Sequence, residues 1–129
     1  MFSQNVAIPD TAFLAALIEE GVDTNEDSLI SYFEAEAVTS PNVSSYLLDR
    51  DFFSNILDMT GIEVLVNLDS LFCCGNLSTN LYFSNNSALE FMNCRKNQLT
   101  RFDLQNKITL SLLAKSCRYH AIILQTQKL

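Results

Sequence analysis

The N-terminal part of the chain carries apolar residues at helical spacing. Between residues 8 and 21 the apolar side chains that recur on one helical face are Phe13, Leu14, Leu17 and Ile18. Asp10 stands before this run, where its carboxylate can cap a helix, and Gly21 follows it, where a helix would end. The pattern predicts a helix over residues 11–20.

A second, shorter helical pattern follows in "SYFEAEAV". It places Phe33, Ala37 and Val38 on one side of a helix, which "TSPN" ends because proline disfavours helical backbone in the residue before it. We therefore expect a helix, an acidic loop and a second helix, in that order, within residues 1–42.

From residue 43 onward, short apolar alternations separated by Asn, Ser and Gly replace the helical spacing. Residues 68–88 align with residues 89–109 at a period of 21. The matched pairs are Leu68 and Leu89, Leu71 and Met92, Cys73 and Cys94, Asn76 and Asn97, and Phe83 and Leu104. A weaker half-period inside each unit predicts two short extended segments per unit, and the next unit would place Leu113 in line with Met92.

A first, irregular unit precedes these two. The stretch "VSSYLLDRDFF" fits the same template with the residues Val43, Tyr46, Leu48, Asp51 and Phe53. A longer connection through "SNILDMTGIEVLVN" leads from it to residue 68. Residues 43–129 thus form about four units, of which the first and the last are irregular.

Stacking explains why the units repeat these residue types. One unit cannot bury its own apolar strand, but stacked units build a continuous core in which Leu71 lies over Met92. Asn76 and Asn97 stand where the chain turns inward, so their amides can bond backbone groups that would otherwise be buried unpaired. Cys73 and Cys94 are in phase with the repeat and are expected to be buried apolar residues.

The remaining thiols and the one histidine carry alternative chemistry. Cys74 is out of phase, so we expect it to be exposed or at a turn, and it or Cys117 could be a reactive or pairing thiol. A zinc cluster would use the four cysteines with His120, but no second CxxC or HxxxH pair supports it. Because His120 lies in the apolar "RYHAIIL" without an orienting partner, we expect no enzyme activity.

Composition and charge limit the classes of protein. With 129 residues and 48% hydrophobic content, the chain can bury one core, as one domain or one short repeat array. The net charge is −7: residues 1–63 hold twelve acids and one base, and residues 95–129 hold seven bases and one acid. The bases are not interleaved with aromatic residues, so we expect no nucleic-acid binding. No apolar run is long enough for a membrane span, and the start shows no signal-peptide pattern.

The acidic loop "DTNEDSLISYFE" matches the spacing of an EF-hand calcium loop. Its candidate ligands, at loop positions 1, 3, 5, 7, 9 and 12, are Asp23, Asn25, Asp27, Leu29 through its carbonyl, Ser31 and Glu34. Ser28 stands at position 6, which needs left-handed backbone that serine adopts at a cost on the order of 1 kcal/mol. We expect a formed loop with weakened calcium affinity.

The pattern LxxLxCxxNxL, with the acidic helix-loop-helix before it, resembles bacterial secreted or surface leucine-rich repeat proteins over residues 7–113. The resemblance implies an α+β fold: residues 1–42 form an EF-hand-like cap, and residues 43–129 form a short leucine-rich repeat solenoid with parallel strands on its concave face. It also implies an extracellular or cell-surface location. The pattern decays after Ile108, where a natural short form, a fragment of a longer array and a drifted copy all stay open.

The same resemblance implies a protein-protein interaction module. Its partner-binding residues would lie on the concave strand face: Ser70, Phe72, Phe91, Asn93 and Arg95. The alternative function is a calcium-binding, EF-hand-like regulatory module, in which the helix pair is the active part.

Overall fold

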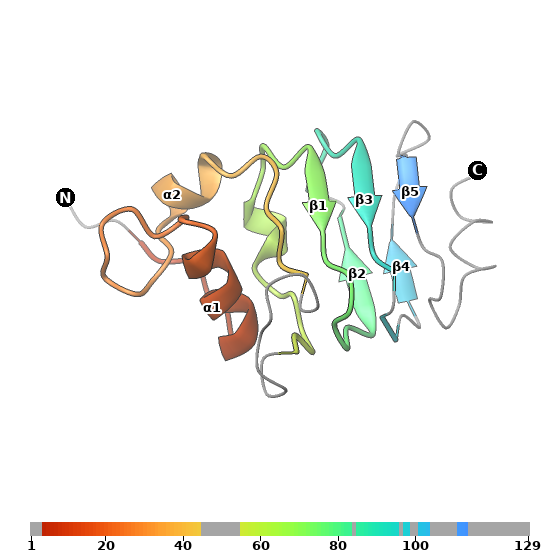
Figure 1. Cartoon of the computed structure of the whole chain (residues 1–129). Helices are drawn as coiled ribbons and strands as arrows, with labels where there is room; N and C mark the ends of the chain where they lie inside the picture. The colour runs from red at the N-terminus through yellow and green to blue at the C-terminus, as the bar shows by residue number, and fades with distance from the viewer. Residues whose placement is uncertain are drawn as a thin grey trace.

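A computed structural model describes residues 4–44, 55–83, 85–95, 97–98, 101–103 and 111–113 of the chain. Figure 1 shows a helical N-terminal part followed by a series of short strands. The elements in chain order are α1 (Thr11–Glu19), α2 (Tyr32–Glu36), the 3-10 helix η2 (Ile62–Val64), β1 (Ser70–Phe72), β2 (Asn80–Tyr82), β3 (Phe91–Asn93), β4 (Arg101–Asp103) and β5 (Ser111–Leu113). Helices and parallel strands therefore follow the change of pattern along the sequence.

The first helix forms where the sequence predicts it. α1 ends in a Schellman motif: the Gly21 N–H donates to the Ile18 carbonyl over 3.0 Å, and the Val22 N–H donates to the Leu17 carbonyl over 3.2 Å. Gly21 makes this turn at φ +85°, which glycine adopts without steric cost.

Asp10 caps α1 and also fastens it to the rest of the chain. One carboxylate oxygen accepts the N–H groups of Ala12 at 2.8 Å and Phe13 at 3.0 Å, as expected of an N-cap. The other oxygen accepts the N–H groups of Leu57 and Asp58, both at 2.9 Å. A single side chain therefore joins the helix start to the connection that leads into the repeats.

The second helix forms, but its predicted apolar face is wrong. Phe33 is 80% exposed and Ala37 is exposed, and only Val38 of the predicted set is buried. α2 instead buries Glu34 and Ala35. The cause is the Glu34 carboxylate, whose hydrogen bonds to the acidic loop turn that side of the helix inward and leave the opposite side, with Phe33, in solvent.

The strands confirm the repeat period. β1 and β3 pair in parallel with the partners Ser70 and Phe91, Leu71 and Met92, and Phe72 and Asn93, each 21 positions apart. β2 and β4 pair in parallel at the same spacing, from Asn80 with Arg101 to Tyr82 with Asp103. The chain alternates between the sheet β1-β3-β5 and the sheet β2-β4, so the units at residues 68–88 and 89–109 each contain two extended segments as predicted (Figure 1).

The third unit is one residue shorter than the sequence analysis predicts. β3 pairs with β5 at a spacing of 20, so Leu112, and not Leu113, is the partner of Met92. Leucine stands at both positions, so the apolar pattern does not distinguish the two registers. The hydrogen bonding of the strands selects one of them.

The first unit is also placed differently from the prediction. A parallel bridge joins Asn42 to Phe72, which puts Val43 at the place of Cys73 and not at the opening leucine place of the template. The Val43 carbonyl accepts an amide hydrogen bond from Asn76 at 3.0 Å, as expected at that place. The template's other apolar and polar positions lie outside the described residues: Tyr46, Leu48, Asp51 and Phe53.

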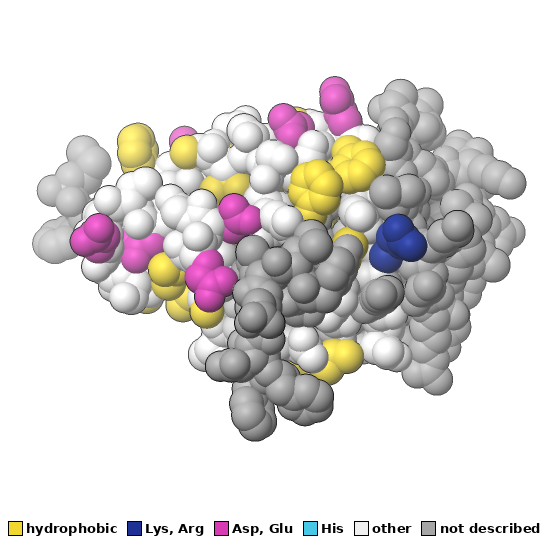
Figure 2. All heavy atoms as spheres, in the orientation of Figure 1, with side chains coloured by type: hydrophobic (Ala, Val, Ile, Leu, Met, Phe, Trp, Pro, Cys, Tyr) yellow, Lys and Arg dark blue, Asp and Glu magenta, His cyan; other side chains and the backbone are white. Residues whose placement is uncertain are grey.

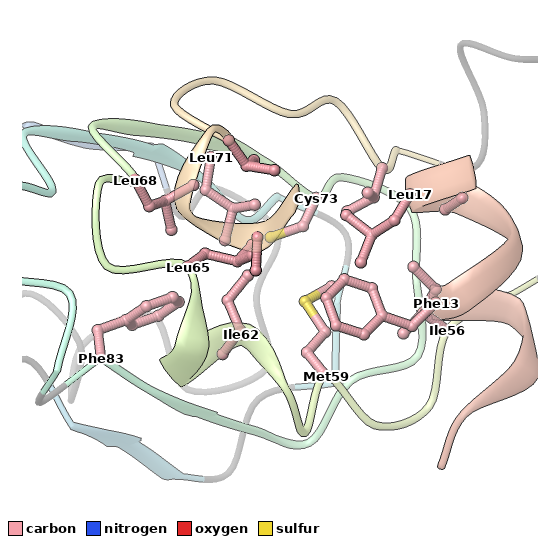
Figure 3. Packing of buried hydrophobic residues seen from close by; sticks show 14 of the residues in the cluster. Phe13, Leu17, Ile56, Met59, Ile62, Leu65, Leu68, Leu71, Cys73 and Phe83 are labelled. Carbon is pink, nitrogen blue, oxygen red and sulfur yellow. The ribbon is translucent and has the colours of Figure 1, made fainter. Parts of the chain in front are cut away.

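The helical part and the repeats share one hydrophobic core. Figure 3 shows Phe13 and Leu17 of α1 facing Ile56 and Met59, beyond which the core continues into the strands. Leu68, Leu71, Cys73, Phe83, Met92 and Cys94 are among its most buried members, each 0% exposed. The buried face of α1 therefore packs against the same core as the strands.

Asparagine side chains bond the turns from inside. The Asn97 amide donates to the carbonyls of Cys73 at 2.7 Å and Cys94 at 3.2 Å, and its oxygen accepts the Ser78 N–H at 3.1 Å. Asn76 makes an equivalent set one unit earlier. The predicted ladder of asparagines is confirmed, because each amide satisfies backbone groups of two neighbouring units.

Candidate functional site

The strand face carries the predicted partner-binding residues together. Ser70 and Phe72 of β1, and Phe91 and Asn93 of β3, are half-buried, and Arg95 just after β3 is exposed. The rings of Phe72 and Phe91 are diagonal neighbours, with centroids 5.3 Å apart and planes tilted by 43°. Figure 2 shows this hydrophobic pair over β1 and β3, with a basic side chain beside it.

The alternation along each strand explains this face. Leu71 and Met92 point into the core, so the residues on either side of them point the other way. A tilted aromatic pair contributes about 0.5–1.5 kcal/mol beyond its area burial, which holds the two rings in a fixed relation. The face is therefore a preformed, partly apolar surface.

Of the two places expected for Cys74, exposed or at a turn, the structure shows the turn and not the exposure. Cys74 is only 1% exposed; its N–H donates to the Ser44 hydroxyl at 2.9 Å, and its thiol lies 3.5 Å from the Asn93 carbonyl. β1 ends at Phe72, so the inside-outside alternation stops before Cys74 and the chain turns inward through Gly75 at φ +74°. Neighbouring units enclose the thiol.

Of the predictions for the other cysteines, those for Cys73 and Cys94 are confirmed and the one for Cys117 is not tested. Cys73 and Cys94 are each 0% exposed and confirm the expectation of buried core residues. Cys117 and His120 lie outside the described residues. Within the part of the chain that the structure describes, no three His, Cys, Asp or Glu side chains gather in a way that could hold a metal ion.

The acidic loop is folded by its own side chains. The Asp23 carboxylate accepts the N–H groups of Asp27 at 3.2 Å and Ser28 at 2.8 Å, and the Asn25 oxygen accepts the Asp27 N–H at 3.1 Å. Ser28 adopts φ +68°, the left-handed backbone expected at loop position 6, and Glu26 adopts φ +61°. These contacts hold the loop in a compact turn.

The Glu34 carboxylate accepts hydrogen bonds from Thr24 and Asn25 of the loop and from Ser31 at the start of α2. One oxygen accepts the N–H of Thr24 at 2.7 Å, the hydroxyl of Thr24 at 3.0 Å and the N–H of Asn25 at 3.2 Å. The other accepts both the N–H and the hydroxyl of Ser31 at 2.9 Å, which completes a capping box at the start of α2. The backbone hydrogen bond from Ser31 is the main cause that lowers the pKa of Glu34 from 4.5 to about 2, in spite of its burial.

The six predicted calcium ligands all lie on this loop, but their carboxylates do not meet. The side-chain oxygens of Asp23, Asn25 and Asp27 accept backbone N–H groups of the loop, and Glu34 accepts donors at both oxygens. Leu29 is 44% exposed and Ser31 is buried. A bound calcium ion would take the oxygens of Asp23, Asn25, Asp27 and Glu34 and would require the Glu34 side chain to exchange some of its present donors.

A second feature beside this loop was not singled out in the sequence. Glu20, Phe33 and Pro41 are among the residues that line a pocket of about 260 Å³ between the end of α1 and the end of α2. The sequence signal for this pocket is the pair of acids, Glu19 and Glu20, at the end of α1. Acids are unfavourable at a helix C-terminus, so their presence there is unusual.

Within the described residues, the structure contains no helix that is both long enough and apolar enough to span a membrane. No family model matches the chain. No curated protein matches it either.

Solved structures do resemble it. The functional domain of InlJ from Listeria monocytogenes, which includes a cysteine ladder, shares 25% sequence identity and a TM-score of 0.59, covering 87% of this chain and 24% of that chain. The CBM51-2 and INT domains of ZmpB from Clostridium perfringens share 20% identity and a TM-score of 0.61, covering 77% of this chain and 19% of that chain. The chain thus spans about a quarter or less of the structures that it resembles. These likenesses, together with the 21-residue register, support a leucine-rich-repeat-like fold.

Proposed function

We propose that this chain is a protein-protein interaction module that binds a protein partner through the concave face formed by β1 and β3. The observation that carries the proposal is the half-exposed pair Phe72 and Phe91 on that face. Aromatic side chains that stand partly exposed on a rigid surface are favoured as binding hot spots, because they bury a large area at little entropic cost. The proposal gives the chain no catalytic role.

The architecture that we propose is a short solenoid. Each described unit contributes a strand to the same sheet, so the two rings are held by stacked neighbours on either side. The helix-loop-helix part, residues 1–42, would cap the first unit through the buried face of α1. We also propose an extracellular or cell-surface location, which the resemblance to domains of two bacterial proteins supports.

The test compares variants that differ only in which apolar surface they remove. The protein, immobilised on a support, is incubated with bacterial and host surface proteins, and retained species are quantified. Phe72→Ser should lower the affinity for a specific partner by roughly 30-fold, as expected of a hot spot worth about 2 kcal/mol. Leu77→Ser is the matched control, because Leu77 is also exposed, at 39%, but lies outside β1 and β3.

The two variants separate the outcomes. A partner that is retained by the Leu77→Ser protein and lost by the Phe72→Ser protein supports the proposal. Equal retention by both variants would contradict a binding role for the strand face. Circular dichroism of each variant shows that the fold is kept.

We propose calcium binding as the second function, with a structural or regulatory site in the acidic loop. The observation that favours it is the backbone of Ser28, which already takes the left-handed conformation that loop position 6 requires. With a Kd of about 1 mM, a calcium concentration of about 10 mM would stabilise the folded protein by about 1.4 kcal/mol.

Thermal unfolding with and without calcium tests this second proposal. The melting temperature should rise with calcium, and the rise should disappear in Asp23→Asn, which removes a ligand charge. Magnesium at the same concentration controls for general screening of the acidic surface. An unchanged melting temperature at millimolar calcium ends the calcium proposal and leaves the strand-face proposal intact.

A further inference from the structure

A pocket lies between the C-terminal ends of the two N-terminal helices, beside the segment Thr39–Pro41 that is hydrogen-bonded to β1. Its volume is about 260 Å³, just below the roughly 300 Å³ at which pockets for drug-sized ligands begin. The side chains that decide its chemistry are Glu20, Val22, Thr24, Phe33, Val38 and Pro41. A cavity of this size suits a single long side chain better than a whole small molecule.

The pocket lining contains two acidic residues, Glu20 and Glu34, and no basic residue. α1 ends with Glu19 and then Glu20 at its C-cap, and no basic residue lies in the last turn of either helix. The carbonyl ends of helices are themselves partly negative, so acids there are locally unfavourable. Residues 1–94 contain only one base, Arg50, to offset twelve acids before residue 64. A bound cation would relieve this repulsion.

Two carboxylates of the pocket are fixed in place. Glu20 accepts the N–H of Asn42 at 2.8 Å, which ties the end of α1 to the start of the repeats. Glu34, also in the lining, is held by hydrogen bonds from Thr24, Asn25 and Ser31. Figure 2 shows acidic side chains gathered over the N-terminal part of this face. The negative charge is therefore positioned before any ligand arrives.

An aromatic ring stands beside these carboxylates. Phe33 lines the pocket and is nevertheless 80% exposed. The hydrogen bonds of Glu34 bury the opposite side of α2 and leave Phe33 on the solvent side. An exposed phenylalanine in an acidic surround contributes little to the fold, but its face attracts a cation. Val38 and Pro41, both buried, supply apolar surface for an aliphatic stem.

We propose that this pocket binds an arginine side chain of a partner protein. The guanidinium stacks on the Phe33 ring and pairs with the Glu20 carboxylate, and the methylene stem contacts Val38 and Pro41. Arginine fits better than lysine because a planar, weakly hydrated guanidinium stacks on an aromatic face and donates hydrogen bonds in its own plane. Neither Phe72 nor Phe91 lines this pocket, so the proposal does not rest on the function proposed above.

Nuclear magnetic resonance titration of the whole chain tests the site. The probes are the tripeptides Gly-Arg-Gly, Gly-Lys-Gly and Gly-Gln-Gly, each blocked at both ends. The arginine peptide should cause saturable shifts of the Gly21, Thr39 and Ser40 amides at millimolar concentration, and added salt should weaken binding. The lysine peptide should bind more weakly, and the glutamine peptide should not bind.

Variants identify which groups bind. Phe33→Leu keeps an apolar side chain but removes the ring face, and should weaken binding about two- to five-fold, whereas Phe33→Tyr should preserve it. Glu20→Gln keeps an acceptor for the Asn42 N–H but removes the charge, and should weaken binding by a similar factor. Glu90→Gln, at an exposed acid outside the pocket, is the matched charge control and should leave the affinity unchanged.

Three results would overturn the proposal. The first is the absence of saturable shifts with the arginine peptide at millimolar concentration. The second is an equal loss of affinity in Glu90→Gln and Glu20→Gln, which would mean diffuse attraction to an acidic surface. The third is equal binding of lysine and arginine peptides, or an unchanged affinity in Phe33→Leu, since either result removes the stacked guanidinium.

Discussion

Replacing Glu34 with glutamine tests the contact that organises the whole N-terminal part. The glutamate is 5% exposed and accepts five hydrogen bonds from three residues, Thr24, Asn25 and Ser31. Glutamine has nearly the same shape but only one acceptor atom. Whichever way the amide turns, its NH₂ group faces N–H donors of the loop or of the helix start. The substitution therefore removes acceptors without creating a cavity.

Two arguments that rest on the same hydrogen bonds give the size of the effect. Leaving a buried donor unsatisfied costs about 1–3 kcal/mol, and at least one backbone N–H loses its partner in the variant. The lowering of the Glu34 pKa from 4.5 to about 2 corresponds to about 3 kcal/mol, at about 1.4 kcal/mol per pH unit. We expect Glu34→Gln to lower the free energy of unfolding by about 3 kcal/mol at pH 7.

The pH dependence has a definite sign. Because the folded-state pKa of Glu34 is below the unfolded value, its contribution is fully present above about pH 4.5 and is lost as the pH falls towards about 2. Wild-type protein should therefore lose more stability than Glu34→Gln over this interval. The other acidic residues are the same in both proteins, so their contributions cancel in the difference.

Urea unfolding followed by circular dichroism measures both effects. Glu36→Gln is the matched control, because Glu36 is exposed on the same helix, and we expect a change within about 0.5 kcal/mol. An unchanged urea slope m shows that the variants differ in stability and not in the surface exposed on unfolding. If Glu34→Gln and Glu36→Gln unfold at the same urea concentration, or if the pH profiles of wild type and Glu34→Gln are parallel, Glu34 does not hold the loop.

Substitutions at three further sites test other contacts by the same unfolding assay. Asp10→Ser keeps a helix cap but loses the link to the connection before η2, and should cost about 1–2 kcal/mol, with Asp10→Ala costing more; equal losses would refute the link. Gly61→Ala should be more destabilising than Gly21→Ala, although both glycines have positive φ. At Gly61 a Cβ would lie 2.9 Å from an Ile8 side-chain carbon, whereas at Gly21 a Cβ would meet nothing within 4 Å. Asn97→Ala should cost about 2–4 kcal/mol by leaving buried backbone groups unpaired, which a loss as small as that of an exposed surface substitution would contradict.

Features that follow the repeat or mark a helix end were predictable from the sequence. The burial and register of residues for which the sequence pattern fits two placements were not. The 21-residue register, the Asn97 ladder and the α1 cap each follow from a residue type at a repeated or terminal place. The register of β5 was missed because Leu112 and Leu113 are both apolar. Cys74 lies at a turn, one of its two expected places, but its burial was not predicted because the alternation on which the prediction depended ends with the strand.

Candidate site residues divide in the same way. The alternation along β1 and β3 predicted which side chains share the outer face, but the contact between the Phe72 and Phe91 rings depends on how the two strands pair. The spacing of the acidic loop predicted a folded turn. The hydrogen bonds of Glu34 to backbone N–H groups were not predictable. They depend on how the loop and the start of α2 are placed relative to each other.

By itself, the sequence determined the order of helices and strands, the period of the repeat and the residues that fill its core, because these depend on local spacing and on side-chain polarity. Only the tertiary structure decided which face of α2 is buried, that Phe33 stands in solvent beside Glu20, and that the thiol of Cys74 is enclosed. The physical reason is that a buried carboxylate must find donors wherever the fold supplies them. The hydrogen bonds that Glu34 makes when buried outweigh the gain from burying Phe33. The pattern of hydrophobic positions alone does not show which of the two residues is buried.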